Sequence, residues 1–246
     1  MNEKKIAIMT EGGQKLASIR DHLASMVKPG VTPLEIEAEA VNLIKKTGGK
    51  ASFKTVPNYY HATCINVNSS LVHGIPTDTP FKDGDLVSID LGLYYQGYHT
   101  DTSVSVIAGK KDIKTQQFIN TGYKALKAGI NAAQPGNKVS DISRAVQSVI
   151  EKAGYTVIRD LTGHGVGKKL HEEPYIPNFV DPHNHDSVLV EGQTLAIEPM
   201  YSQGGHEIKI EADDWTISTA DGSLAALVED TIAITKNGPI VLTKQN

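Results

Sequence analysis

Two stretches of the chain carry the same helical spacing of apolar positions. Apolar residues recur every three or four positions after Pro29-Gly30, and again at a constant offset after Pro135-Gly136. The two runs end at Gly48 and Gly154. A Pro-Gly turn, a 3.6-residue period and a closing glycine together predict an amphipathic helix in each stretch. Thr32-Pro33-Leu34-Glu35 adds a capping box with proline at the first helical position.

Strand-like patterns also recur, in the same order in each half of the chain. An acid-glycine pair, at residues 83–84 and 191–192, leads into a short apolar run that ends at an acid. Further on, another acid precedes the alternating apolar positions of a β-strand. The four acids are Asp90 and Asp101 in the first half and Glu198 and Glu229 in the second. Three echoes in one order predict a single α+β domain over residues 1–246, with two pseudo-symmetric halves in which helix pairs cover an antiparallel β-sheet.

The first two acids lie in a predicted β-hairpin. A turn centred between Tyr95 and Gln96 sets Asp90 and Asp101 directly opposite each other. A turn at Gln96-Gly97 instead leaves the two acids one position apart on a shared face. Both registers bring the two carboxylates together.

Four converging carboxylates raise an electrostatic problem. Two like charges about 4 Å apart cost roughly 4 kcal/mol at an effective dielectric of 20. A whole domain is stable by only about 5–15 kcal/mol, so the acids must be protonated, separated or neutralised. Protonation requires large upward pKa shifts in several groups at once. Bound divalent cations are the simpler solution, and we therefore expect a metal site.

Histidines in glycine-containing segments supply candidate imidazoles for such a site. His164 lies in Gly163-His164-Gly165-Val166-Gly167, His171 follows it, and His73 precedes Gly74. Glycines beside His164 would let the backbone approach a crowded centre. The other histidines are interpreted as surface or structural residues: His22, His61, His99, His183, His185 and His206.

Composition narrows the class of partner and the compartment. A formal net charge of -4 and a pI near 6.1 give no basic surface for nucleic acid or an anionic membrane. The N-terminal residues are charged and no apolar run long enough for a signal peptide or membrane span follows them. Cys64 is the only cysteine, which excludes an intrachain disulfide and a thiolate metal cage. We expect a cytoplasmic protein whose metal ligands are oxygen and imidazole.

The ordered motifs resemble those of the type I methionine aminopeptidases over nearly the whole chain. They are His73-Gly74-Ile75-Pro76, Asp90, Asp101, Gly163-His164-Gly165-Val166-Gly167, His171-Glu172-Glu173-Pro174, Ile197-Glu198-Pro199-Met200 and Glu229. The resemblance implies the pita-bread (creatinase/aminopeptidase) fold. It also implies hydrolytic removal of the N-terminal methionine from peptides and nascent proteins by a monomer, with the ribosome as a candidate partner.

The same resemblance assigns roles to individual residues. It makes Asp90, Asp101, His164, Glu198 and Glu229 the ligands of two divalent metal ions, with Asp101 and Glu229 bridging them. Glu198 would also relay a proton as general acid and base. His73 and His171 would contact the substrate and stabilise the tetrahedral intermediate. Oxygen-rich ligation with one imidazole favours manganese, iron or cobalt over a dedicated zinc site.

A substrate pocket is implied as well. Phe53, Val56 and Tyr59 match the family's methionine pocket, and Leu170 and Trp215 complete it. An apolar, polarisable cavity suits a thioether side chain.

The segment around the last ligand departs from the family pattern. Leu227 replaces a more usual glutamine, and Asp230 replaces histidine or asparagine. Proline-specific peptidases of the same fold often carry an acid in the latter place, so an Xaa-Pro aminopeptidase or dipeptidase is the first alternative. Met200, where those relatives usually have glycine, opposes it. A non-catalytic peptide-binding relative is the second alternative, and the complete set of ligands opposes that one.

Overall fold

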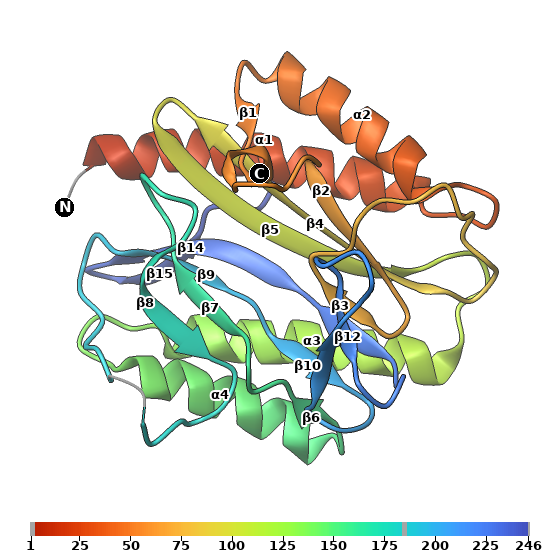
Figure 1. Cartoon of the computed structure of the whole chain (residues 1–246). Helices are drawn as coiled ribbons and strands as arrows, with labels where there is room; N and C mark the ends of the chain where they lie inside the picture. Colours follow the sequence, from red (N-terminus) through yellow and green to blue (C-terminus); the bar gives the residue numbers. More distant parts are fainter. Residues whose placement is uncertain (1–2, 184–185, 246) are drawn as a thin grey trace.

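The computed structural model of the chain describes residues 3–183 and 186–245 (Figure 1). Its α-helices are α1 (Glu3–Met26), α2 (Pro33–Lys46), α3 (Ile113–Ala132) and α4 (Val139–Lys152), and a 3₁₀ turn covers Phe53–Thr55. Its strands are β1 (Lys50–Ala51), β2 (Thr63–Val67), β3 (Ser70–Val72), β4 (Leu86–Tyr95), β5 (Tyr98–Ile107), β6 (Thr156–Val157), β7 (Thr162–Gly165), β8 (Glu172–Pro177), β9 (Thr194–Ile197), β10 (Met200–Ser202), β11 (Ile208–Ile210), β12 (Ile217–Thr219), β13 (Ala225–Leu227), β14 (Glu229–Thr235) and β15 (Gly238–Val241).

The helices predicted from the Pro-Gly echo are α2 and α4. At the start of α2, the Thr32 hydroxyl accepts a hydrogen bond from the Glu35 amide at 3.2 Å. The Glu35 carboxylate in turn accepts one from the Thr32 amide at 2.8 Å. The predicted capping box is therefore confirmed, and it satisfies amide groups that would otherwise lack partners at the helix start.

Nine of the described strands, from both halves, join in one antiparallel sheet, and the other six form two three-stranded sheets, β13-β10-β6 and β11-β12-β3. The main path of the nine-stranded sheet runs β1-β4-β5-β14-β9-β7-β8, with β2 added on β4 and β15 on β14. In the β4–β5 hairpin Tyr95 pairs with Tyr98, so the turn is Gln96-Gly97, the second of the two predicted registers. Both turn residues have positive φ, which matches the right-handed twist of a tight hairpin. Asp101 pairs with Gly92, so it is offset from Asp90 by two positions and not by one as expected. Because side chains alternate along a strand, an offset of two leaves both acids on the same face of the sheet.

The central strand pair β5–β14 relates the two halves of the molecule. Asp230 pairs with Thr102, and Glu229 pairs with Ser103. The third sequence echo aligns Asp101-Thr102 with Glu229-Asp230. The equivalent residues Thr102 and Asp230 therefore face each other where the two halves meet. The predicted pseudo-twofold arrangement is confirmed by this register.

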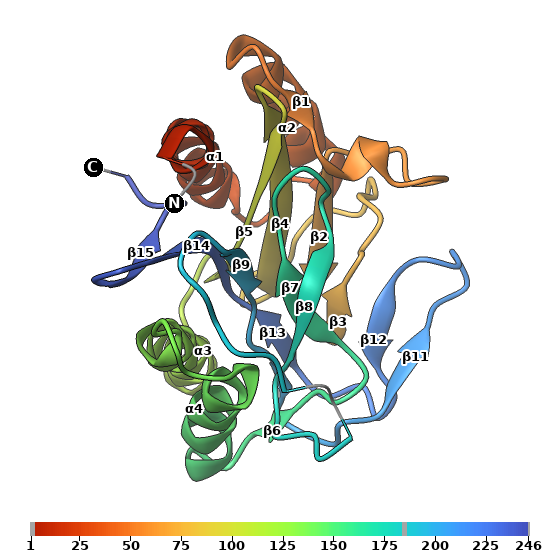
Figure 2. The same ribbon diagram turned by 90° about the vertical axis from the view of Figure 1, so that its left-hand side faces the viewer.

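The helices cover one face of the sheet and leave the other free for a site. Figures 1 and 2 show α1, α3 and α4 behind the central strands and α2 beside β1 and β2 at the upper edge, while β3, β11 and β12 lie on the opposite side. Each half has its own apolar core: Leu16, Ile36 and Ile89 belong to the first, and Phe118, Ile142 and Leu195 to the second. Burial of these side chains fixes the sheet from behind. None of the described helices combines the length and apolarity that crossing a membrane requires.

Candidate metal centre

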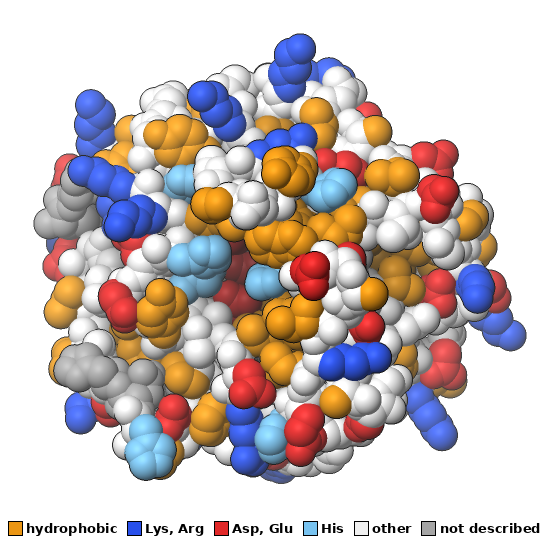
Figure 3. Space-filling view, viewed as in Figure 1, with side chains coloured by type: hydrophobic (Ala, Val, Ile, Leu, Met, Phe, Trp, Pro, Cys, Tyr) orange, Lys and Arg blue, Asp and Glu red, His pale blue; other side chains and the backbone are white. Residues whose placement is uncertain are grey.

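A cavity of about 300 Å³ opens on the face of the sheet that the helices leave free. Figure 3 shows this hollow near the centre of the face, with acidic side chains inside it, histidines around it and hydrophobic side chains beside it. Its lining consists of Phe53, Val56, Tyr59, Cys64, Val72, His73, Asp90, Asp101, Asp160, Leu161, Thr162, His164, Leu170, His171, Tyr175, Glu198, Met200, Trp215 and Glu229. Every residue that the sequence nominated as a ligand, a catalytic group or part of the substrate pocket therefore faces one space.

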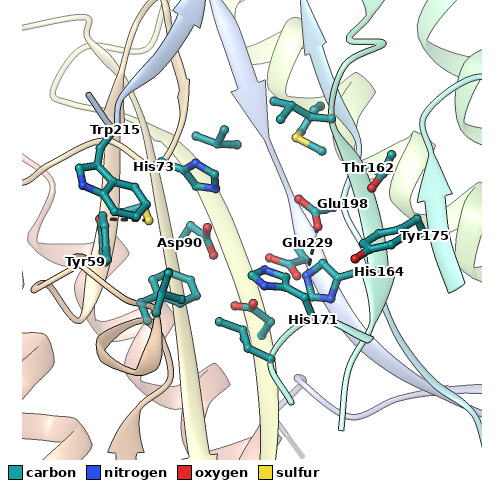
Figure 4. A pocket seen from close by; sticks show the side chains of 18 of the residues that line it. Tyr59, His73, Asp90, Thr162, His164, His171, Tyr175, Glu198, Trp215 and Glu229 are labelled. Carbon is teal, nitrogen blue, oxygen red and sulfur yellow. Dashed lines mark hydrogen bonds and ion pairs between the residues drawn. The ribbon is translucent and has the colours of Figure 1, made fainter. Parts of the chain in front are cut away.

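Five elements from both halves bring the nominated ligands together. Asp101 on β5, His164 on β7 and Glu229 on β14 offer ligand atoms that all lie within 4.8 Å of one another. Asp90 comes from β4, and Glu198 follows the last residue of β9. The Glu198 carboxylate lies 3.5 Å from His164 Nε2, and Figure 4 shows the labelled acids converging beside this imidazole.

Only glycine fits at the two positions that flank His164 in β7. A Cβ atom on Gly163 would lie 2.6 Å from the Ala196 carbonyl oxygen, and one on Gly165 would overlap the Glu173 backbone. His164 Nδ1 lies 2.8 Å from the Gly165 carbonyl oxygen. Because a carbonyl can only accept, Nδ1 carries the hydrogen and Nε2 presents a lone pair to the cavity.

Burial raises the pKa of all four acids, and repulsion between carboxylates adds to the rise in Asp101, Glu198 and Glu229. Removal from water is the largest cause in each case. It raises the pKa of Asp90 to about 8. The pKa values of Asp101 and Glu198 are raised further by the neighbouring Asp90, and that of Glu229 by Asp101. The protein alone therefore does not stabilise these acids in their charged form.

The residues present fit a divalent metal ion. One carboxylate oxygen of Asp90 and one of Glu229 are buried without a hydrogen-bond partner among the described residues. Buried polar atoms normally have partners, and an exception in a native structure calls for an explanation such as a bound ion. Carboxylate oxygens and an imidazole nitrogen with a free lone pair form a suitable donor set for such an ion. A bound cation would satisfy the orphaned oxygens and stabilise the ionised carboxylates.

Two further histidines lie at the mouth of the cavity. His73 has positive φ, and its conformation is held by Gly74, whose amide donates to Asn66 Oδ1 at 2.9 Å. The His171 ring lies edge-on to His164 with the ring centres 4.4 Å apart. Both side chains reach solvent, yet partial removal from water at the cavity wall lowers the pKa of each. Neutral imidazoles that can donate a hydrogen bond thus face the acids (Figure 4).

One wall of the cavity is apolar and aromatic. Phe53, Tyr59, Cys64 and Leu170 form a buried cluster against which Trp215 packs. Tyr59 lies edge-on to Trp215 with ring centres 5.0 Å apart, and its hydroxyl donates to the Thr63 carbonyl at 2.8 Å. Figure 4 shows Tyr59 and Trp215 on the opposite side of the acids from His164. This wall is where the sequence places the methionine pocket.

The opposite wall was not anticipated from the sequence. Its residues are Asp160, Leu161, Thr162 and Tyr175, and Val72, Cys64 and Met200 also reach the cavity without having been nominated. Thr162 lies two positions before His164 in the same strand, so strand alternation could have identified it. Tyr175 pairs with His164 across β7 and β8, a relation that is visible only once the register is known.

The two positions that depart from the family pattern do not line the cavity. Leu227 is fully buried in β13 and pairs with Met200. Asp230 follows Glu229 in β14, so its side chain lies on the helix-covered face. Of the histidines left aside, His99 is buried beside Ser52. His185 lies outside the described residues.

Comparison with known proteins gives one consistent family. The model of metallopeptidase family M24 matches residues 7–236. A methionine aminopeptidase from Clostridium perfringens is 38% identical over 242 residues, covering 98% of this chain and 97% of its own length. The crystal structure of a methionine aminopeptidase from Thermotoga maritima has a TM-score of 0.96 and 39% identity, and covers 100% of this chain and 98% of its own.

A proline-specific relative is more distant. Prolidase from Pyrococcus furiosus has a TM-score of 0.80 and 26% identity, and this chain covers 65% of its length. Both neighbours have the antiparallel sheet with helices that is described above, so the expected pita-bread fold is confirmed. The chain belongs to metallopeptidase family M24 and, within it, to the methionine aminopeptidases.

Proposed function

We propose that this chain hydrolyses the peptide bond after an N-terminal methionine in peptides and nascent proteins. The observation that carries the proposal is the shape of one cavity, in which a cluster of buried acids adjoins an apolar, aromatic wall. An apolar cavity beside a polar reactive centre is the arrangement of a selective small-molecule site. The side chain of the first residue would occupy the apolar wall, and its carbonyl group would lie over the acids.

Asp90, Asp101, His164, Glu198 and Glu229 are proposed to hold two divalent ions, with Asp101 and Glu229 between them. When bound, the ions would act as Lewis acids on the scissile carbonyl and lower the pKa of the attacking water toward about 7. Manganese, iron or cobalt suits this donor set. Asp101 and Glu229 lie on the two strands that meet at the pseudo-twofold axis, which supports their central role.

Glu198 is proposed to move the proton during the reaction. Its side chain is 13% exposed and faces the cavity beside His164 Nε2. One Glu198 oxygen would accept the proton from the attacking water and then deliver it to the leaving amine. A positioned general acid and base typically contributes about 10²–10⁴-fold to a rate.

His73 and His171 are proposed to act on the substrate itself. Each is a neutral donor at the cavity mouth, because its pKa is lowered by partial removal from water. A donor aimed at an oxygen that gains negative charge stabilises the transition state more than the ground state. Both histidines would therefore accelerate the reaction without binding the ions.

The apolar wall is proposed to select the methionine side chain. Phe53, Val56, Tyr59, Leu170 and Trp215 contribute it. Cys64 adds a polarisable sulfur, and the Tyr59 hydroxyl is already engaged by the Thr63 carbonyl. An apolar wall with a polarisable sulfur suits a thioether side chain.

A proline-specific activity loses its main argument. The acid that suggested it, Asp230, lies behind the sheet and is paired there with Arg20 at 3.3 Å. The Asp230 side chain cannot contact a substrate from that position. A cytoplasmic location, action as a monomer and encounter with nascent chains at the ribosome complete the proposal.

A comparison of two peptides tests the proposed substrate. Met-Ala-Ser and Ala-Pro-Ala are incubated with the protein and added manganese or cobalt, and the released amino acid is measured. We expect release of methionine only. Preferential cleavage of the proline peptide would replace the substrate assignment. Cleavage of neither peptide by protein that has bound metal would favour a peptide-binding role.

A further inference from the structure

A second polar cluster lies directly behind the acids, on the helix-covered face of the same two strands. Arg20 reaches it from α1, with its side chain 15% exposed. Its Nη1 atom donates to Thr102 Oγ1 at 2.8 Å, to Asp230 Oδ1 at 3.3 Å and to the Thr243 carbonyl at 3.2 Å. Thr102 and Asp230 are the two residues that pair at the pseudo-twofold axis. One guanidinium group therefore holds both halves of the molecule where they meet.

This cluster connects to the backbone of both central acids. The Thr102 hydroxyl, which accepts from Arg20, donates to the Glu229 carbonyl at 2.9 Å. Thr102 also follows Asp101 directly in β5, and Asp230 follows Glu229 directly in β14. A displacement of Arg20 would thus move the peptide units on which Asp101 and Glu229 are mounted.

Threonines reinforce the same connection. The Thr231 hydroxyl accepts from the Asp101 amide at 2.8 Å and donates to the Asp101 carbonyl at 2.7 Å. The Thr231 amide donates to Thr243 Oγ1 at 3.0 Å, and that hydroxyl donates to Asp230 Oδ1 at 2.7 Å. The hydrogen bonds form a continuous path from Arg20 through the strand pair.

Stability alone is a weak reason for this arrangement. A largely buried ion pair gains little over apolar side chains of similar volume, because both charges must leave water. Placement on the axis and connection to both acids point to control of geometry.

We infer that Arg20 is a positioning residue that sets the spacing between Asp101 and Glu229 through Thr102 and Asp230. The inference rests on the proposed role of these acids in holding two ions. Arg20 does not line the cavity, so it would act through Thr102 and Asp230 and not on the substrate or an ion directly. Its effect is on the affinity for metal, since outer residues that orient ligands typically change affinity about 10–100-fold.

The test is manganese binding by calorimetry, with the melting temperature of metal-free protein measured in parallel. The variants are Arg20→Leu, Asp230→Leu and the double variant Arg20→Leu/Asp230→Leu. Arg20→Leu leaves the Asp230 charge without its cation, and Asp230→Leu leaves Arg20 with Asp21, at 2.9 Å, as its remaining acid. Both single variants should therefore melt at a lower temperature. The double variant should regain most of that loss because neither charge remains. We expect it nevertheless to bind the weaker of two manganese ions about 10–100-fold less tightly than the unmodified chain.

Controls separate positioning from a merely structural role. Lys15→Met removes another cation from α1 that contacts the sheet, at Tyr95, and should leave manganese binding unchanged. Arg20→Lys keeps the charge but not the shape of the guanidinium group, and should weaken manganese binding. This variant tests the inference if the double variant fails to fold. The rate deficit of Arg20→Lys should disappear at high manganese, with an unchanged KM for the peptide.

Normal binding of two ions by the double variant, or by Arg20→Lys if the double variant does not fold, would overturn the inference. Failure of the unmodified chain to bind two ions would instead remove the proposed function. The two failures are therefore distinguishable.

Discussion

The two faces of the β5–β14 pair treat neighbouring acids in opposite ways. On the helix-covered face, Asp230 has a cation in Arg20 and a hydroxyl donor in Thr243. On the cavity face, Glu229 has three carboxylates around it and a buried oxygen without a partner among the described residues. The two acids are adjacent in sequence, so strand alternation alone assigns them to these environments.

Asp230 has the partners that a buried carboxylate needs, whereas Glu229 does not. Behind the sheet, the protein supplies the charge and the donors that a buried carboxylate needs. In front, it supplies further acids and a histidine, so the positive charge that would keep these acids ionised must come from outside the chain. An acid cluster of this kind is evidence for a ligand because its neighbour shows how the same fold satisfies an acid for structural purposes.

Replacing the acids on the cavity face should have the largest effect. We expect Asp101→Ala and Glu229→Ala to abolish methionine release and to lower the number of bound manganese ions. Each proposed bridging carboxylate serves both ions, so its loss affects the whole centre. Activity assays and metal analysis of dialysed protein measure the two effects.

The neighbouring acid provides the matched control. Asp230→Asn keeps an oxygen that can accept hydrogen bonds from Arg20 and Thr243. At saturating manganese its activity should stay within about tenfold of that of the unmodified chain, the smaller end of the effects typical for residues behind metal ligands. Two tightly bound ions in both alanine variants would contradict the assignment of the bridging acids.

Removing a histidine at the cavity mouth should separate rate from metal binding. We expect His73→Ala to bind manganese like the unmodified chain and to lose about 10²–10³-fold in kcat, as when one oxyanion donor is removed. His73 would act only after the ions are in place. Steady-state kinetics at saturating manganese measure the loss, and a fall in metal content would show that His73 is a ligand instead.

Much of this front-to-back division follows from local sequence patterns. The echoes and the Gln96-Gly97 hairpin place Asp90 and Asp101 on one face, because a strand has a period of two. The capping box and the Pro-Gly turns fix where α2 and α4 begin. These features depend on residues close together in the chain, which a single sequence displays.

Other parts of the site depend on contacts between distant segments. The pairing of His164 with Tyr175 and the approach of Arg20 to Asp230 depend on how strands and helices pack. No local pattern records that packing. The family resemblance identified Asp230 as unusual and linked it to substrate choice, whereas the structure places its side chain behind the sheet, beside Arg20. Register and packing, which are not local properties, decide that question.

The apolar wall of the cavity should show a smaller effect. We expect Trp215→Ala to raise the KM for Met-Ala-Ser about tenfold while kcat changes less, because part of a hydrophobic pocket contributes a modest binding energy. Trp215 packs against Tyr59 and lies near His73. Substitution of Val41, an exposed apolar residue of α2, by alanine is the control. An unchanged KM in Trp215→Ala would place the methionine pocket elsewhere.

The smallest expected effect is on the stability of metal-free protein. The native pKa of Asp90 is raised from 3.8 to about 8, so between these pH values the folded state binds more protons than the unfolded state. Stability is then fully present below the unfolded pKa and falls as pH rises through the native pKa. We expect metal-free protein to melt several degrees lower at pH 8.5 than at pH 6, at about 2–4 °C per kcal/mol.

The metal-loaded protein is the control for that comparison. Bound ions keep the acids ionised in the folded state and should remove the decline. Glu229→Gln should reduce the decline in metal-free protein by removing one of the charges. A metal-free protein whose melting temperature rises between pH 6 and pH 8.5 would contradict the raised pKa values.

The most direct test is a calorimetric titration of metal-free protein with manganese at pH 7, repeated in buffers of different ionisation enthalpy. It measures whether the acid cluster binds divalent cations. Two ions should bind per chain, and protons should be released because acids with raised pKa values ionise when a cation arrives. No binding, or binding without proton release, would contradict the account.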